Sequence, residues 1–164
     1  MPARPLIDSL DFARNGREIS DAVPVSQLPR LQDVLENSEG DLNYTVRGGK
    51  DRQGILCLDV GISGSFRLRC QRCLGGLQHA VAIASRLLLR SQDELDALDE
   101  SGIEEEHESI LARSELDVLD MLEEEILLSL PISPRHAEGE CNMAAGKNAG
   151  SEENNPFAIL AKLK

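Results

Sequence analysis

The stretch ILCLDVGISGSFRLRCQRCLGGLQHAVAIASRLLL, residues 55–89, decides the fold. Every second residue is aliphatic in 55–62, and the alternation returns at 66–70 and in the first half of 77–89. A period of two puts alternate side chains on opposite faces of a strand. Glycines at 61, 64 and 75–76 separate the runs. The stretch therefore predicts antiparallel strands joined by short turns.

The flanking sequence adds helices to this sheet. Residues 42–47 predict one more strand, and Ser26 is expected to cap a short helix over 27–36 with Pro29 in its first turn. Ser114 starts the predicted main helix, in which aliphatic residues recur every three or four positions until Pro131. We expect an α+β fold: an antiparallel sheet or partly closed barrel covered by one main helix, with a short N-terminal helix and a flexible C-terminal tail.

The domain organisation follows from changes in composition. Residues 1–141 are expected to form a single α+β domain, in which the acidic stretch 91–113 has no clear period and is predicted to be a mobile loop. Residues 142–155 are small and polar, which is typical of a flexible linker. Residues 156–164 form a short apolar segment in which Phe157 and Leu160 share a face. This segment is expected either to dock back on the domain or to bind a partner.

Charge is distributed unevenly along the chain. The net charge of −12 argues against a protein that coats nucleic acid by bulk electrostatics. Residues 45–90 nevertheless carry eight Lys/Arg against two acids, whereas residues 91–125 carry fifteen acids against one arginine. Either region can recruit a partner or be a solvated surface. With only 2% aromatic residues, RNA contact is expected through phosphates, and the candidate RNA- or partner-binding residues are Arg67, Arg69, Arg72, Arg86 and Arg90.

Two cysteines at 70 and 73 form the most specific local motif. If the chain turns through Gln71 and Arg72, a C-x2-C pair directs two thiolates at one tetrahedral ion, as in zinc half-sites. His136 and Cys141 are the candidate second pair, and His79 is the reserve ligand. Reduced thiols packed at the edge of the core remain the alternative to zinc. Cys57 lies inside a strand pattern and is expected to be packed rather than reactive.

The sequence carries no pattern typical of an enzyme. No glycine-rich phosphate loop opens a helix, and no serine, histidine and acid fall in a nucleophile context. We therefore expect no catalytic residue and no small-molecule substrate. The N-terminus lacks an apolar secretory signal and no run of apolar residues is long enough to span a bilayer, so a cytoplasmic protein without membrane contact is expected.

Three blocks in fixed order carry a family resemblance: LRCQRCL at 68–74, ELDVLDMLEEEILLSLP at 115–131, and NPFAIL at 155–160. Together they resemble the large ribosomal RNA subunit accumulation protein (YceD) family. The resemblance implies a non-enzymatic role in synthesis, processing or stability of 23S ribosomal RNA and in large-subunit biogenesis, by binding RNA or a ribosome-associated protein. Many relatives carry a second cysteine pair where this chain has His136 and Cys141. A thiol redox protein or a zinc-dependent regulatory protein is the alternative function.

Overall fold

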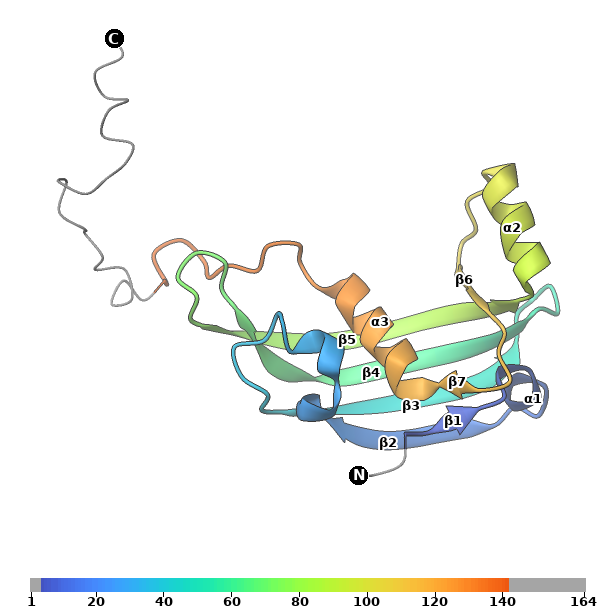
Figure 1. Ribbon diagram of the computed structural model, residues 1–164, viewed down its shortest axis with the longest axis horizontal. Helices are drawn as coiled ribbons and strands as arrows, with labels where there is room; N and C mark the ends of the chain where they lie inside the picture. The colour runs from blue at the N-terminus through green and yellow to red at the C-terminus, as the bar shows by residue number, and fades with distance from the viewer. Residues whose placement is uncertain (1–3, 142–164) are drawn as a thin grey trace, which may run out of the picture.

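The computed structural model describes residues 4–141 and is built on one open sheet (Figure 1). Its strand order is β2-β3-β4-β5-β6, with bounds β2 Glu18–Pro24, β3 Asp41–Lys50, β4 Leu56–Arg69, β5 Gly76–Arg90 and β6 Glu108–Leu111. The pairs are antiparallel except for β5 and β6, which run parallel. A second, two-stranded sheet pairs β1 (Leu6–Ile7) with β7 (Leu116–Asp117). The predicted α+β class is confirmed, and the sheet does not close into a barrel.

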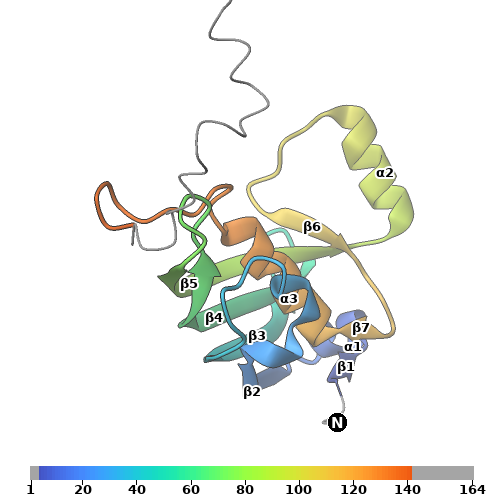
Figure 2. The ribbon, with the colours of Figure 1, turned by 60° about the vertical axis from the view of Figure 1, so that its left-hand side comes forward.

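Helices lie on one face of the sheet and at one end of it. Helix α1 (Ser9–Arg14) and helix α3 (Val118–Ser129) pack over the covered face, together with the short 3-10 turns η1 (Val25–Gln27) and η2 (Pro29–Leu31). Helix α2 (Gln92–Ser101) stands away from the sheet, as Figures 1 and 2 both show. None of the helices in residues 4–141 is long and apolar enough to cross a membrane.

The core is the layer between the sheet and these helices. The alternating aliphatic residues of β4 face it, so that Leu58, Phe66 and Leu68 are almost completely buried. Leu122 and Ile126 of α3 close it from the other side. Burial of leucine-sized side chains stabilises by roughly 1.5–3 kcal/mol each, which makes this aliphatic layer the main source of stability in a chain with few aromatic residues.

Glycine allows α1 to cross β3 at close range. A Cβ atom added to Gly48 would lie 2.5 Å from the Phe12 carbonyl oxygen and 2.7 Å from the Ala13 Cα atom. Any larger residue at this position would push the helix off the strand. The opposite face of the sheet carries small side chains instead of a packed layer, and Ser20, Ala22, Asn43, Ser63 and Ala82 are all exposed there.

Two predicted elements differ from the structure in their extent. Residues 55–62 and 66–70 were expected to be separate strands, but β4 is continuous because β5 pairs with it from Cys57 to Arg69 without a break. The predicted helix over 27–36 is wrong: the chain forms η1 and η2 there. Leu28, Leu31 and Leu35 are all buried, as the helical spacing indicated, but two successive 3-10 turns and a bridge from Leu35 to Leu68 bury them instead of one α-helix.

The acidic stretch 91–113, predicted to be a mobile loop, contains α2 and β6. A capping box begins α2: the Ser91 hydroxyl accepts from the Glu94 backbone N–H, and the Glu94 carboxylate accepts from the Ser91 backbone N–H. Acidic residues in the first turn are also favourable at the positive end of the helix dipole. The loop prediction missed this helix because its apolar side consists of little more than Leu95 and Leu98, which are only partly buried, and this is too short a pattern to predict a helix.

The main helix contains a buried acid. Asp117, rather than Ser114, caps α3 through the backbone N–H groups of Leu119 and Asp120. In the second turn of the helix, the Glu123 side chain is 1% exposed and accepts a 2.9 Å hydrogen bond from the Arg30 backbone N–H. Burial raises the pKa of Glu123, although the Arg30 hydrogen bond and the Arg4 guanidinium act in the opposite direction.

A raised carboxyl pKa makes stability depend on pH with a defined sign. The folded chain holds the Glu123 proton more tightly than the unfolded chain, so this group lowers the free energy of unfolding as pH rises from its unfolded pKa through its folded pKa. In Glu123→Gln this decrease in the free energy of unfolding should disappear. The slope of the free energy of unfolding against pH then changes by up to about 1.4 kcal/mol per pH unit. Urea denaturation at several pH values measures it. Glu115→Gln, at an exposed position, is the control; identical pH profiles for both variants would contradict the assignment.

Candidate metal centre

The turn between β4 and β5 brings two cysteines together. The strand ladder ends at the pair Arg69 and Gly76. Beyond it the Cys70 N–H donates to the Gly75 carbonyl and the Leu74 N–H donates to the Cys70 carbonyl, both at 2.9 Å. This tight turn puts the sulfurs of Cys70 and Cys73 on the same side, which a continuous strand would not do. The turn that the C-x2-C motif requires is therefore present.

The loop after α3 returns to this turn. Helix α3 ends at Ser129, and Pro131 cannot continue it. The loop is then fixed by a 2.8 Å hydrogen bond from the Gln71 N–H to the Pro134 carbonyl. Figures 1 and 2 show the two loops side by side at one end of the molecule. Segments more than sixty residues apart in the sequence thus meet at one place.

Their meeting assembles a cluster of Cys70, Cys73, His136 and Cys141, called here the Cys3His cluster. One ligand atom from each residue lies within 4.8 Å of all the others. The Cys70 and Cys141 sulfurs are 3.9 Å apart, and the His136 Nδ1 atom is 3.4 Å from the Cys73 sulfur and 3.7 Å from the Cys141 sulfur. These are the four residues that the sequence predicted as ligands. His79, the reserve ligand, instead stacks its ring against Phe66, with centroids 5.7 Å apart.

The spacing fits a tetrahedral zinc ion. Zinc–sulfur bonds of about 2.3 Å and zinc–nitrogen bonds of about 2.0–2.1 Å imply S···S separations near 3.8 Å and S···N separations near 3.6 Å in a tetrahedron. The three observed separations, 3.9, 3.4 and 3.7 Å, lie close to these values. Three soft thiolates and one imidazole are also the donor set that favours zinc over hard cations such as Mg²⁺. The residues therefore fit the metal that the sequence suggested.

A backbone carbonyl fixes the orientation of the histidine. The His136 Nε2 atom lies 2.9 Å from the Gly76 carbonyl oxygen, which can only accept, so Nε2 carries the proton. The lone pair of Nδ1 then points into the cluster. Metal-binding histidines are commonly held by such a second hydrogen bond, which fixes the ring and its tautomer. Sequence patterns do not reveal this contribution of Gly76, because it comes from the backbone alone.

The cluster favours one thiolate and disfavours another. The pKa of Cys70 falls to about 5 because its sulfur accepts from the backbone N–H of Cys73, and also from those of His136 and Arg72. Burial, followed by the neighbouring sulfurs of Cys73 and Cys70, raises the pKa of Cys141 to about 11. Crowding several thiolates without a cation is thus unfavourable, and a divalent cation would relieve the repulsion. Cys57 lies apart from the cluster in β4, where burial raises its pKa.

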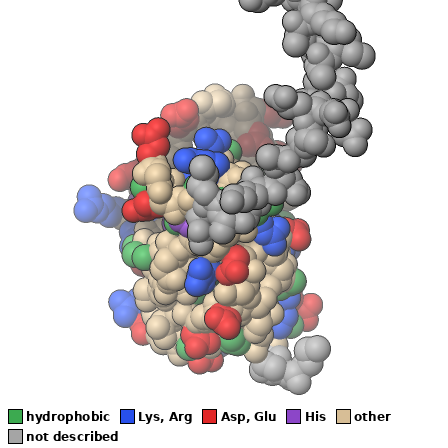
Figure 3. Space-filling model, turned by 90° about the vertical axis from the view of Figure 1, so that its left-hand side faces the viewer, with side chains coloured by type: hydrophobic (Ala, Val, Ile, Leu, Met, Phe, Trp, Pro, Cys, Tyr) green, Lys and Arg blue, Asp and Glu red, His purple; other side chains and the backbone are tan. Residues whose placement is uncertain are grey.

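The five arginines predicted to bind RNA or a partner do not form one patch. Arg67, Arg69 and Arg72 lie at the end of the molecule that carries the Cys3His cluster. Arg86 and Arg90 lie near the other end of β5, a strand of 15 residues and hence about 50 Å long. Figure 3, which faces the end with the cluster, shows basic side chains interspersed with acidic ones.

Carboxylates pair with three of these arginines. Arg86 makes a bidentate pair with Asp59 at 2.6 and 3.0 Å, and Arg90 pairs with Glu105. Arg67 lies 3.5 Å from Glu36. Among residues 4–141, Arg69 and Arg72 have no carboxylate within 4.0 Å, and their guanidiniums reach only the backbone carbonyls of Leu35 and His136. The unneutralised charge is therefore next to the cluster.

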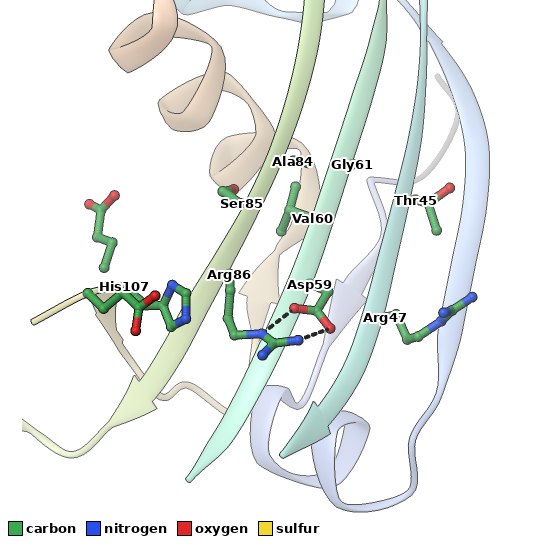
Figure 4. Close-up of a pocket in the computed structure, with 11 residues that line it drawn as sticks. Thr45, Arg47, Asp59, Val60, Gly61, Ala84, Ser85, Arg86 and His107 are labelled. Atoms are coloured by element: carbon green, nitrogen blue, oxygen red, sulfur yellow. Dashed lines mark hydrogen bonds and ion pairs between the residues drawn. The ribbon is translucent and has the colours of Figure 1, made fainter. Parts of the chain in front are cut away.

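A pocket of about 670 Å³ lies elsewhere, on the open face of the sheet (Figure 4). Asp59 and Arg86 form its floor and neutralise each other, while Gly61 and Ala84 leave the space above the strands free. His107 reaches the rim from the loop before β6. Within the described residues, His107 has no hydrogen bond to a serine, cysteine or carboxylate. The lining also includes Ser85, whose hydroxyl donates to the Glu125 carboxylate of α3, and the charged side chains of Arg47, Glu106 and Glu108.

Phe157 and Leu160, the predicted partner-docking residues, lie outside the described residues, as does the rest of 142–164. Arg135 was not singled out by sequence reasoning, yet it is exposed in the same loop as His136. Its position next to a predicted ligand was the only indication of a role in the sequence.

Comparison with known proteins places this geometry in a family context. A family model described as "Large ribosomal RNA subunit accumulation protein YceD" matches residues 58–164, a range that contains all four members of the Cys3His cluster. A protein of that description from Haemophilus influenzae is 24% identical over 166 residues, covering 96% of this chain and 94% of the relative. No solved structure matches the chain.

The turn that holds the two cysteines contains a strained residue, which yields a stability test. Leu74 is 66% exposed and has a φ of +60°, a left-handed conformation that costs a residue with a Cβ atom about 1–2 kcal/mol. Glycine adopts this conformation without that cost, but it loses more conformational entropy on folding, which lowers the free energy of unfolding by about 0.5–1 kcal/mol. Leu74→Gly should therefore be more stable than Leu74→Ala by about 0.5–1 kcal/mol in urea denaturation with chelator present. Lower stability of the glycine variant would show that the turn is not held in this conformation.

Proposed function

Because the chain belongs to the YceD family, whose members are named for accumulation of large-subunit ribosomal RNA, we propose that it supports 23S ribosomal RNA and the biogenesis of the large ribosomal subunit as a non-enzymatic binding factor. It acts in the cytoplasm, on ribosomal RNA or a ribosome-associated protein, and it has no small-molecule substrate. The Cys3His cluster with the two unneutralised arginines beside it supports this proposal most directly.

The Cys3His cluster holds a structural zinc ion in this proposal. Cys70 and Cys73 come from the β4–β5 turn, and His136 and Cys141 come from the loop after α3. Four protein ligands fill all four coordination positions of a tetrahedral zinc ion. A site with no open position is typical of structural rather than catalytic zinc. The ion ties the two loops together, and the Gln71–Pro134 and His136–Gly76 hydrogen bonds set the geometry in advance.

Arginines around this end supply the contact to RNA. Arg69 and Arg72 are exposed, and Arg135 is exposed on the adjoining loop. Their guanidiniums suit bidentate contact with phosphate oxygens. The chain has three Phe, one Tyr and no Trp, so base stacking contributes little and recognition rests on the RNA backbone and its shape.

The acidic end of the molecule suits a different partner. Helix α2 and the loop that follows it, residues 91–108, carry nine Asp/Glu and no Lys or Arg. Such a surface repels RNA and attracts a basic polypeptide, such as the Lys/Arg-rich part of a ribosomal protein. In this arrangement the two ends of the sheet serve two kinds of partner.

A redox or zinc-dependent regulatory role is the second candidate function. The lowered pKa of Cys70 and its 3.9 Å separation from the Cys141 sulfur favour it, because a thiolate facing a second thiol is prepared for disulfide formation. Zinc would block that reaction by occupying both sulfurs. The metal content of the purified protein therefore separates the two candidates.

The first test is metal content. We expect about one zinc per chain by plasma emission spectroscopy, and its loss in Cys70→Ser and in His136→Ala. Cys57→Ser is the matched control, since Cys57 is buried in β4 outside the cluster, and it should keep the metal. His136→Cys should also keep it, because cysteine supplies an equivalent soft ligand. Metal-free protein with a reversible Cys70–Cys141 disulfide would contradict the structural role and favour the redox candidate.

The second test is the salt dependence of RNA binding. Affinity for protein-free 23S ribosomal RNA should fall linearly on logarithmic axes as KCl rises. Each phosphate contact contributes about 0.7–0.9 to the slope, so the double variant R69Q/R72Q should lower the slope by about 1.5. Arg52→Gln, at an exposed position in the β3–β4 turn, should leave it unchanged. Undetectable binding at low salt, or equal slopes for both variants, would contradict direct phosphate contact at this end.

A further inference from the structure

An apolar groove lies beside the Cys3His cluster and is separate from the arginines. Its volume is about 330 Å³, and it runs between β4, the end of α3 and the loop after it. The lining is almost entirely aliphatic: Val34, Leu68, Leu127, Leu128, Leu130, Pro131, Ile132 and Pro134, with Gln71 as the polar member. Neither the zinc site nor phosphate contact uses these side chains, so the groove needs its own explanation.

Large apolar side chains gather at this end without cover from the described residues. Leu128 is 62% exposed and Ile132 is 105% exposed, and both line the groove. Leu74, in the neighbouring turn, is 66% exposed. Three of the five exposed large hydrophobic residues in 4–141 therefore lie at one end. A gathering of this kind typically marks a surface that another segment covers.

The chain leaves the described region close to this groove. Cys141 is its last residue, and the Cys141 sulfur lies 3.9 Å from that of Cys70. Gln71, the next residue after Cys70, lines the groove. The 23 residues that follow Cys141 therefore start beside the groove.

We propose that residues 156–161, Pro-Phe-Ala-Ile-Leu-Ala, occupy this groove in the same chain. The segment carries Phe157, Ile159 and Leu160, which match an aliphatic lining. The fourteen residues 142–155 that precede it contain one large apolar side chain, Met143, so the apolar character is concentrated at 156–161. Lys162 and Lys164 follow, and a cation is favoured near the C-terminal carbonyls of a helix such as α3.

The length of the connection allows this contact. Fourteen residues reach at most about 45–50 Å when extended, and as a flexible coil they span about 20 Å on average. Cys141 contacts Cys70, and the next residue, Gln71, lines the groove. The distance from Cys141 to the groove is therefore shorter than both the extended length and the average coil length of residues 142–155. A tether of this length keeps the segment at an effective concentration of about a millimolar or more, which is ample for a short apolar contact. A segment of another protein would lack this advantage.

A single tryptophan tests the proposal in the full chain, because the natural sequence contains none. In Phe157→Trp the emission should be shifted to the blue and quenched several-fold less by iodide than that of a free tryptophan. Leu160→Trp is a second reporter in case the larger ring does not fit at 157. Leu128→Asp and Ile132→Asp, added separately to either reporter, should each lower the ratio of docked to free segment about tenfold and expose the ring, because each loses a leucine-sized contact.

The control is Ile103→Asp, since Ile103 is 67% exposed but lies after α2, outside the groove. Protection that is lost with Leu128→Asp and Ile132→Asp, kept with Ile103→Asp and independent of protein concentration supports the proposal. A water-exposed reporter in the chain with its natural groove would overturn it. So would protection insensitive to the groove variants. Protection that falls on dilution would assign the groove to a second copy of the chain and would also overturn it.

Discussion

The constraint on which the site depends is the turn at residues 70–75. Two backbone hydrogen bonds close it and put the sulfurs of Cys70 and Cys73 on one side of the chain. The Gln71–Pro134 hydrogen bond then attaches the loop after α3, and the His136–Gly76 hydrogen bond orients the imidazole. The cluster is thus assembled by backbone groups before any ligand bond forms, which lowers the entropy that metal binding must overcome.

The position of this cluster gives the molecule two different ends. At one end, Arg69 and Arg72 have no carboxylate partner among residues 4–141 and lie beside the Cys3His cluster. At the other end, α2 and the loop that follows it are rich in acidic residues, and Glu105 of this loop forms an ion pair with Arg90. The net charge of −12 hides this separation. In the function proposed above, one end contacts an RNA backbone and the other a basic polypeptide, and their separation keeps each end from repelling the other's partner at short range.

The sequence predicted the sheet, the main helix and the four cluster residues, because each rests on a local pattern: alternation, helical spacing or ligand spacing. It did not predict β2, which pairs with β3 through Ile19 and Val23 but contains Asp21 and Pro24. The parallel pairing of β6 depends on where α2 returns the chain, which no local pattern records. The same reason explains the arginines: their positions on the predicted strands were visible, but the pairing of Arg67, Arg86 and Arg90 with Glu36, Asp59 and Glu105 requires contacts between distant segments.

The central claim, that the β4–β5 turn and the loop after α3 are joined through one metal ion, is tested most directly by X-ray absorption at the zinc edge on protein purified from cells. The account predicts three sulfur neighbours at about 2.3 Å and one nitrogen neighbour at about 2.0–2.1 Å. A shell of only oxygen and nitrogen neighbours would contradict it, since the ion would then be bound outside the Cys3His cluster. The absence of an absorption edge would contradict it as well.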